Sequence, residues 1–380
     1  MVSARTDIWG LLSRYGVVLL AIFILLVLPL SLGIFRLGLL AKYLSLAFCA
    51  VGIVLIWGYG GILSLGQGVF FGLGSYMMAM FLKLERAAEA GSSTSALSTF
   101  FGQAGLPDFM SWNSVEALPW WWEPFHHVWF TIPAILILPP LLAFVLAYVN
   151  FRRRVGEVYF SIITLSLSAI MAIVIVGQQG YTGGINGITD FKTFMGIDLD
   201  QDKAKVVMYY ITAGLLIACV LVGQFILRSR LGKVLVAIRD REDRVRFSGY
   251  DPALFKAFIF SVAALFSSIG GAMFTMQIGL ASPSLVGIVP SIEMVIYAAV
   301  GGRLSLVGAV YGSMLVGYGK TFFSENFVQY WLYLIGALFV VVVMFLPGGL
   351  ASLIDKFRPA KNAEDGATAT AVEDLSPEVR

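Results

Sequence analysis

Residues 228–256 read RSRLGKVLVAIRDREDRVRFSGYDPALFK, the one long charged stretch that lies between apolar segments. It carries eight of the 26 Lys and Arg residues of the chain. Ionised side chains at this density cannot enter lipid, so the stretch must face water. The chain is therefore expected to alternate between segments that enter a membrane and a charged segment that stays beside it.

The composition sets the class of protein. The chain has 380 residues, of which 58% are hydrophobic and 13% are charged, whereas a water-soluble domain is nearer half apolar and a quarter charged. Apolar runs of about 20 residues recur, which is the length of a membrane-spanning helix. We therefore expect an all-α integral membrane protein. The small net charge of +3 gives no reason to expect a nucleic-acid partner.

The apolar runs define about ten candidate transmembrane helices, of which eight to ten are expected to cross the membrane. The third is short and Gly-rich, which suggests a broken or re-entrant segment. The candidate spans are residues 15–35, 37–57, 68–82, 128–149, 157–177, 206–227, 257–277, 286–301, 304–322 and 330–347.

The distribution of basic residues predicts the topology. Ten crossings put both termini on one side, and with the N-terminus in the cytoplasm the cytoplasmic segments hold 18 Lys and Arg residues against 6 outside, while Lys42 and Lys320 fall inside candidate spans. This excess favours an N-in, C-in arrangement. The expected parts are a cytoplasmic N-terminus (1–14), a transmembrane domain (15–350) with external loops 83–127 and 178–205, and a disordered cytoplasmic tail (359–380).

Glycines give the strongest local signal. Residues 58–76 read GYGGILSLGQGVFFGLGSY, in which Gly68 and Gly72 have the spacing that lets helices approach closely. Tight packing is one reading. The other is a broken helix whose free backbone groups, with Gln67 and Tyr76, line a solute path. A weak internal repeat is also visible, because GGILSL (60–65) and GGRLSL (301–306) differ at one position.

Two further polar residues are candidates for a solute path. Glu293 is the only acidic residue well inside a predicted span, and an ionised group there costs at least a few kcal/mol unless it faces a cavity or a partner. Asn186 lies in TGGINGI (182–188), a Gly-rich external turn that suits an outer gate or a docking point, although most such segments are simply loops.

Within the charged stretch, residues 233–239 (KVLVAIR), from Lys233 to Arg239, are expected to be helical, with Val234, Ala237 and Ile238 on one apolar face. Gly249 is expected to stop the helix, and Asp251-Pro252 to open the next one. A short amphipathic helix with a charged end fits a groove on another protein, although many basic loops are simply solvated.

An enzyme is a poor hypothesis for this chain. Gly319-Lys320-Thr321 looks like the end of a phosphate-binding loop, but the Gly required five positions before Gly319 is replaced by Met314. The two histidines, His126 and His127, are adjacent and make a poor metal chelate. We expect no catalytic residues, no cofactor and no metal.

Six segments together resemble the permease subunits of ABC importers for branched-chain amino acids, and within them the urea-type branch. They are GYGGILSLGQGVFFGLGSYM (58–77), VYFSIITLSLSAIM (158–171), TGGINGI (182–188), RLGKVLVAIRDREDRVRFSGYDPALFKAFIFSVAALFSSIGGAM (230–273), SIEMVIYAAVGGRLSLVGAVYGSML (291–315) and LPGGL (346–350).

This resemblance implies a multi-pass protein of the bacterial inner membrane that pairs with a second, homologous permease subunit in the lipid bilayer. Two cytoplasmic ATPase subunits and a periplasmic solute-binding protein would complete the importer. The family's coupling pattern maps onto Ala237, Ile238, Arg239, Glu242 and Gly249, within the segment that includes Lys233. The residues after Glu242 depart from the small ones that are usual there.

Three functions remain open at this point. The long segment 83–127 and the neutral Gln67 favour a urea or short-amide permease. A branched-chain amino acid permease is the alternative within the family. A stand-alone channel or secondary carrier is the alternative from another class, but a channel does not need a charged docking helix, and a carrier would need more polar groups inside the membrane.

Overall fold

The computed structural model describes residues 16–92, 106–191, 193–327 and scattered positions between 329 and 350. The expected N-terminal segment 1–14 and the tail 359–380 lie outside these residues, as does most of the expected span 330–347.

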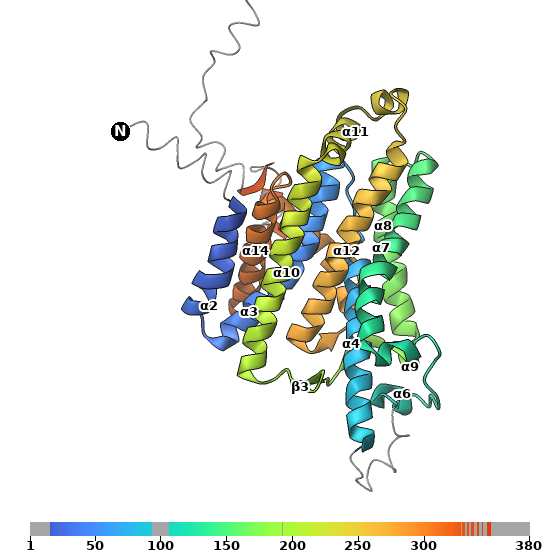
Figure 1. Ribbon diagram of the computed structural model, residues 1–380, viewed down its shortest axis with the longest axis vertical. Helices are drawn as coiled ribbons and strands as arrows, with labels where there is room; N and C mark the ends of the chain where they lie inside the picture. Colours follow the sequence, from blue (N-terminus) through green and yellow to red (C-terminus); the bar gives the residue numbers. More distant parts are fainter. Residues whose placement is uncertain are drawn as a thin grey trace, which may run out of the picture.

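Long helices run up and down along one axis of the molecule (Figure 1). Five of the described helices are long and apolar enough to cross a membrane, or six if a bent pair is counted as one span. They are α3 (Ile34–Ile53) with its continuation η2 (Val54–Tyr59), α7 (Val128–Arg152), α8 (Glu157–Gly177), α10 (Asp202–Arg228) and α12 (Pro252–Ile278), and the bent pair is α13 (Ile288–Gly301) with α14 (Leu306–Asn326). The expectation of an all-α membrane protein is confirmed, whereas the count of eight to ten crossings and the orientation stay predictions.

Shorter elements connect the long helices or precede them. A helix over residues 16–31 includes η1 (Phe23–Val27) and α2 (Leu28–Ser31). The remaining helices are α4 (Gln67–Ser92), α6 (Asp108–Trp112), η3 (Glu123–His126), α9 (Gln179–Thr182), η4 (Gly184–Asn186), α11 (Arg230–Phe247) and η5 (Pro283–Leu285). Two antiparallel strand pairs, β1 (Ile188–Thr189) with β4 (Leu280–Ala281) and β2 (Thr193–Phe194) with β3 (Ile197–Asp198), contain two residues per strand.

Helix α12 forms the centre of the bundle and packs against α3, α4 and α7. Most of α12 is buried, while α7 and α8 expose most of their apolar surface, as expected for helices at a lipid boundary. Glycines allow the central helices to approach closely: a Cβ atom at Gly271 would lie 1.8 Å from the carbonyl oxygen of Phe71. The packing at the centre therefore depends on small residues, as is usual between helices in membranes.

The predicted break in the Gly-rich segment lies earlier than expected. Helix η2 ends at Tyr59, the backbone is non-helical over residues 60–66, and α4 then runs without interruption for 26 residues. The expected short span 68–82 is thus part of a longer, continuous helix. Gly61 has φ +73°, a conformation that ends a helix easily when no Cβ is present.

Hydroxyl groups of α8 satisfy the backbone groups that this break leaves free. The amide of Leu65 donates to Thr164 Oγ1 at 3.2 Å, and Ser161 Oγ donates to the carbonyl oxygen of Leu63 at 2.6 Å. Non-helical backbone at membrane depth is tolerated only where neighbouring helices or water satisfy it. Hydrogen bonds with α8 therefore stabilise the non-helical segment 60–66.

The two similar hexapeptides in the sequence occupy equivalent places in the structure. Each follows a helix and turns through its second glycine, since Gly61 and Gly302 both have positive φ. The two turns also touch: Tyr59 Oη donates to the carbonyl oxygen of Leu304 at 2.7 Å. The repeat is thus a pair of helix breaks that meet at one end of the bundle.

Candidate functional site

Helix α11 lies across the end of the bundle at the top of Figure 1. Ser229 caps its first turn by accepting a bond from the amide of Leu231, and the backbone kinks at Arg241. Gly249 follows with φ +87°, and the Asp251 side chain caps α12, which opens with Pro252. The predicted helix, its glycine stop and the Asp-Pro start are confirmed.

One face of α11 packs against the chain's own helices. Leu235 and Ile238 are 1% and 2% exposed, whereas Lys233 and Ala237 face solvent. The sequence suggested that the apolar face with Ile238 meets another protein, but in this structure Ile238 anchors α11 to the bundle. The surface that a partner can reach is the charged side of the helix.

Arg239 joins α11 to the Gly-rich break. Its Nη1 donates to the carbonyl oxygen of Gly58 at 2.7 Å, and its Nε donates to Asp240 Oδ1 at 3.0 Å. A Cβ atom at Gly61 would lie 2.9 Å from Arg239 Cγ, so the side chain passes directly over the break. Movement of α11 is thereby linked to the backbone that leads into α4.

Glu242 is held by residues of its own chain. Its carboxylate accepts from Lys256 Nζ at 2.7 Å and from Arg246 Nη2 at 3.0 Å. Lys256 is 3% exposed; its ammonium also lies 3.6 Å from Glu157 and over the ring of Phe151. Glu242 therefore connects the far end of α11 to the start of α12 and the start of α8.

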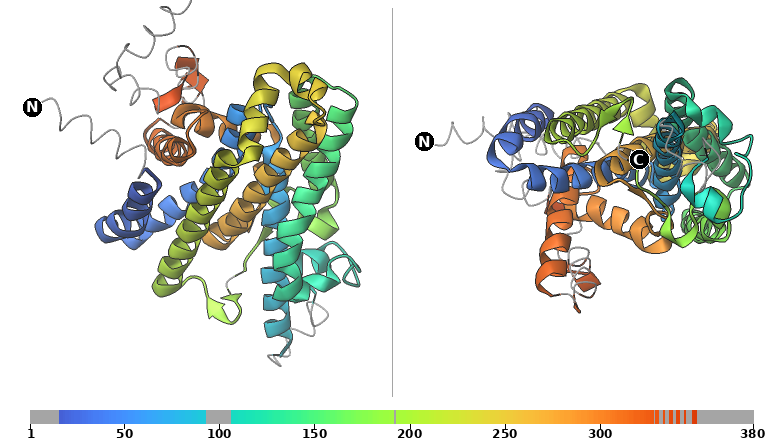
Figure 2. Two further views of the ribbon diagram at one scale, coloured as in Figure 1. Left: turned by 45° about the horizontal axis from the view of Figure 1, so that its top comes forward. Right: turned by 90° about the horizontal axis from the view of Figure 1, so that it is seen from below.

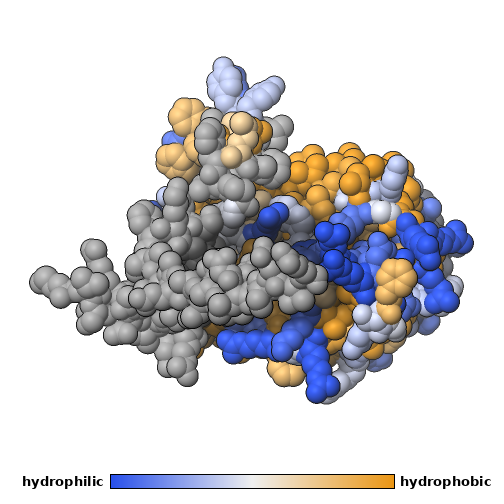
Figure 3. All heavy atoms as spheres, turned by 90° about the horizontal axis from the view of Figure 1, so that it is seen from above, coloured by the Kyte–Doolittle hydropathy of each residue, from blue (hydrophilic) through white to orange (hydrophobic). Residues whose placement is uncertain are grey.

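The last residue of α11, Phe247, is an exposed aromatic residue that the sequence pattern alone did not single out. Phe247 is 92% exposed and Tyr250 is 51% exposed. Seen from this end, many hydrophilic side chains gather on the part of the face that is not grey, and hydrophobic side chains lie beside them (Figure 3). Aromatic residues such as phenylalanine are enriched at protein–protein interfaces. The sequence shows a phenylalanine directly after a charged run, whereas its exposure is visible only in the structure.

A cavity of about 760 Å³ lies between α3, α8, α13 and α14, and Glu293 forms part of its wall. Seen from below, α14 extends away from the rest of the helices (Figure 2). The carboxylate of Glu293 is paired with Lys320 of α14, whose Nζ lies 2.8 Å from Oε2, and Tyr297 Oη donates to the same oxygen at 3.4 Å. Glu293 therefore faces a cavity, and its role in a solute path stays a prediction.

Lys42 of α3 lines the same cavity and is half-buried. In the sequence it appeared only as a basic residue inside a span, and Lys320 only as part of a false phosphate-binding motif. Neither position signals a charged cluster, because residues from α3, α13 and α14 meet only after folding. The cavity therefore holds two ammonium groups and one carboxylate.

The residues predicted for the solute path around Gln67 make close packing contacts here, and their role in a solute path stays a prediction. Gln67 is fully buried, and its Oε1 accepts from Ser267 at 2.9 Å. The Gly68 amide donates to Ser291 Oγ at 3.2 Å, and a Cβ at Gly72 would lie 2.2 Å from the side chain of Val286. None of these three residues lines the charged cavity, so among the described residues the structure does not bring them together with Glu293.

Tyr76 and Asn186 lie apart from that cavity as well. Tyr76 is 5% exposed, and its buried hydroxyl has no hydrogen-bond partner among the described residues. Asn186 is exposed in η4, next to Gly187, which turns with φ +72°. Their roles in a solute path stay predictions.

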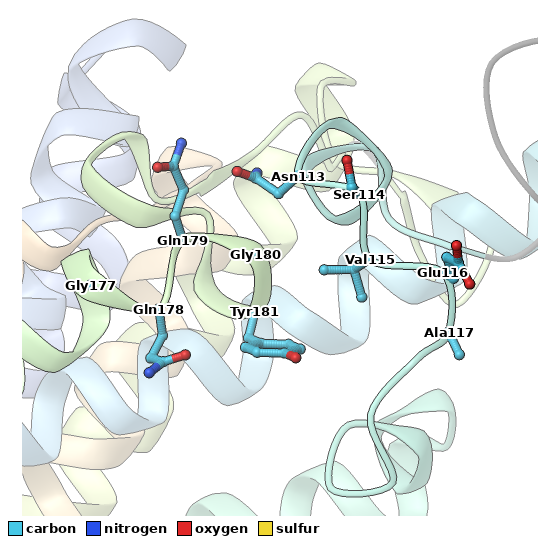
Figure 4. Close-up of a pocket in the computed structure, with 10 residues that line it drawn as sticks. All are labelled: Asn113, Ser114, Val115, Glu116, Ala117, Gly177, Gln178, Gln179, Gly180 and Tyr181. Atoms are coloured by element: carbon cyan, nitrogen blue, oxygen red, sulfur yellow. The ribbon is translucent and has the colours of Figure 1, made fainter.

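A second hollow, of about 650 Å³, opens at the end of the molecule opposite α11. Two segments face each other across it, 113–117 and 177–181, and they offer amide and hydroxyl groups from Asn113, Ser114 and Gln179 (Figure 4). Trp122 Nε1 donates to the carbonyl oxygen of Tyr181 at 3.1 Å and fixes the tryptophan-rich segment beside the hollow. This surface adjoins the Gly-rich turn that contains Asn186.

The sequence of this chain is similar to those of known transport proteins. Residues 35–343 match the model described as "Branched-chain amino acid transport system / permease component". The high-affinity branched-chain amino acid transport system permease protein LivM of Escherichia coli is 22% identical over 339 residues, which is 83% of this chain and 69% of that protein. The LivM protein of Salmonella typhimurium is also 22% identical, over 79% of this chain and 66% of its own length.

A third relative aligns over a shorter stretch. The permease protein BraD of Pseudomonas aeruginosa, of the same kind of transport system, is 28% identical over 127 residues, which is 33% of this chain and 41% of that protein. No solved structure matches the chain. Because the family model covers most of the sequence, the chain belongs to the family of permease components of branched-chain amino acid transport systems.

Proposed function

We propose that this chain is a membrane-spanning subunit of an ATP-driven importer and forms part of the path for an amino acid with an apolar side chain. ATP hydrolysis would take place on two separate ATPase subunits, and a periplasmic protein would deliver the solute. A second permease subunit would complete the path through the bilayer. The chain itself would perform no chemistry.

The observation that carries the proposal is the bond from Arg239 to Gly58. It connects a solvent-facing charged helix to a helix break inside the bundle, so a push on α11 can reach the transmembrane helices. A stand-alone channel would have no use for this connection. We expect the charged side of α11 and the exposed ring of Phe247 to contact an ATPase subunit.

The proposed orientation places α11 in the cytoplasm. The turn between α7 and α8, which contains Arg153 and Arg154, lies at the α11 end, because Lys256 contacts Phe151 and Glu157 on either side of it and also Glu242 of α11. Helices α6 and α9 lie at the other end (Figure 1). The excess of basic residues on the α11 side supports an N-in, C-in arrangement with up to ten crossings. The hollow between residues 113–117 and 177–181 would then face the periplasm, where it can meet the solute-binding protein.

Two observations favour amino acids over urea. The relatives are named for branched-chain amino acid transport, and the cavity holds two lysines and a glutamate, which a neutral solute does not require. Urea stays the second candidate because Gln67 keeps a buried amide nitrogen without a partner among the described residues, and a small amide can bind such a group.

Vesicles that contain the complete importer test the proposal. ATP inside the vesicles should drive accumulation of labelled leucine, and labelled urea should remain at background. Removal of the ATPase subunits should abolish leucine accumulation. Accumulation of urea without leucine would replace the amino acid assignment by the urea assignment.

A further inference from the structure

We infer that the charged cavity recognises the zwitterionic backbone of an α-amino acid, with Glu293 binding its ammonium group and Lys42 and Lys320 binding its carboxylate. This inference rests on the proposed function, because the transport path supplies the solute. It adds the recognition site and the role of each charged group in it.

The charges that line the cavity are unbalanced. Glu293 and Lys320 neutralise each other at 2.8 Å, and their side chains are 13% and 36% exposed. Lys42 lies within the span Ile34–Tyr59, close enough to be repelled by Lys320 and attracted by Glu293. In the part of the chain that the structure describes, no hydrogen bond or ion pair involves its ammonium group. A cation at this depth is costly unless an anion or water meets it.

A carboxylate is the anion that fits this arrangement. Placed between Lys42 and Lys320, it would give each lysine an oppositely charged partner. The ammonium group of the same ligand would then donate hydrogen bonds to the carboxylate of Glu293. This carboxylate can accept about four hydrogen bonds and already accepts from Lys320 and Tyr297. Every cation in the loaded cavity would contact an anion.

The remaining walls suit a hydrophobic side chain. Leu46 of α3, Phe274 of α12 and Met294 of α13 line the cavity beside the charged groups. The volume of about 760 Å³ lies in the range of about 300–1,000 Å³ that is usual for small-molecule sites. The charged groups of the cavity match the charges of an amino acid, and its apolar walls match a branched aliphatic side chain. Urea has neither a charge nor an apolar side chain.

Binding of three related ligands to the assembled importer in nanodiscs, without the solute-binding protein, tests the inference. Leucine carries both charges, leucinamide lacks the carboxylate, and 4-methylpentanoate lacks the ammonium group. We expect the wild-type complex to bind leucine at least about 10-fold more tightly than either analogue, a difference of about 1.4 kcal/mol.

The variants pair each protein group with the ligand group that it should bind. Lys42→Met should weaken the binding of leucine about 10-fold. The affinity for leucinamide should stay within about two-fold of the wild-type value, because leucinamide has no carboxylate for Lys42 to bind. Glu293→Gln should weaken the binding of leucine and leave the affinity for 4-methylpentanoate unchanged. Since this change removes the carboxylate that Lys320 contacts, Glu293→Gln with Lys320→Met provides a second form in which the whole ion pair is absent.

Two controls isolate the charge. Lys42→Arg keeps a cation and should keep the preference for leucine over leucinamide. Lys205→Met removes a lysine with 43% side-chain exposure on α10 and should change none of the three affinities.

Equal weakening of all three ligands by Lys42→Met, or no weakening of leucine, would overturn the recognition site. ATP-driven leucine uptake by the wild-type importer, measured on the same preparations, would still support the proposed function in that case. Absence of that uptake would reject the proposed function, and the recognition site with it.

Discussion

The guanidinium of Arg239 and the carbonyl oxygen of Gly58 lie 2.7 Å apart and form a hydrogen bond, although the residues are 181 positions apart in the sequence. Gly58 belongs to η2, directly before the non-helical stretch 60–66. The amide of Gly68, at the start of α4, is bonded in turn to Ser291 of α13, the helix that carries Glu293. A continuous series of packed contacts therefore runs from α11 to the helix that bears the cavity's carboxylate.

Loss of this bond should uncouple ATP hydrolysis from transport. We expect Arg239→Ala to lower ATP-driven uptake at least about 10-fold, because a hydrogen bond from a charged group contributes about 1.5–3 kcal/mol and here holds α11 on the break. The double variant with Glu242→Ala should abolish uptake while the protein still inserts into the membrane. Uptake and ATP hydrolysis in reconstituted vesicles measure both effects.

A control is Lys205→Ala, since Lys205 is a basic residue with 43% side-chain exposure near the start of α10, outside the charged side of α11. It should retain near wild-type uptake. Wild-type rates in the Arg239 and Glu242 double variant would contradict a coupling role for this site.

The ion pair between Lys256 and Glu242 should stabilise the end of the bundle that carries α11. Lys256→Met removes a buried cation that contacts Glu242 at 2.7 Å and the ring of Phe151. We expect the free energy of unfolding to fall by about 1–3 kcal/mol, because the carboxylate of Glu242 loses a hydrogen bond from a charged group. Thermal unfolding of the purified protein in detergent measures the change, and Lys233→Met, which removes an exposed lysine of α11, should leave it unaltered. Equal melting temperatures for Lys256→Met and the wild type would count against the predicted contribution.

Close packing between α4 and α12 should make Gly74 intolerant of even one added methyl group. A Cβ at Gly74 would lie 2.1 Å from the carbonyl oxygen of Ser268, so Gly74→Ala must force the two backbones apart. Overpacking of this kind costs about 1–3 kcal/mol or more. Gly214→Ala on α10 is the control, because nothing lies within 4 Å of the place that its added methyl group would take. The yield of folded protein after detergent extraction should fall for the first variant only, and a similar yield for both would contradict the packing argument.

The sequence predicted the parts of the fold that depend on local pattern. Hydrophobic length indicated the long helices, and Gly249 with Asp251-Pro252 gave the end of α11 and the start of α12. The sequence could not show that 60–66 is the broken part and that α4 continues to Ser92, because the break is held by Ser161 and Thr164 of a distant helix.

The candidate site was only partly predictable for the same reason. Glu293 stood out as a lone acid in an apolar segment, but its partner Lys320 lies 27 residues later, and Lys42 comes from α3. Ile238 was expected to face a partner because helical periodicity shows that a face is apolar without showing what covers it. In the fold, the chain's own helices cover it.

The C-terminal segment should be dispensable. Residues 360–380 are polar, with low hydrophobicity and no helical period. Truncation after residue 359 should leave expression and uptake near wild-type levels, measured by immunoblot and by leucine accumulation. Loss of expression after truncation would show that this segment contributes to folding or insertion.

The central claim is that this chain provides a path and obtains its driving force from ATPases bound at α11. The most direct test compares labelled leucine in liposomes that hold the complete importer with liposomes that hold this chain alone. We predict ATP-dependent accumulation in the first and neither accumulation nor leakage in the second. Leucine that equilibrates or accumulates through the isolated chain, without ATPases, would contradict the claim.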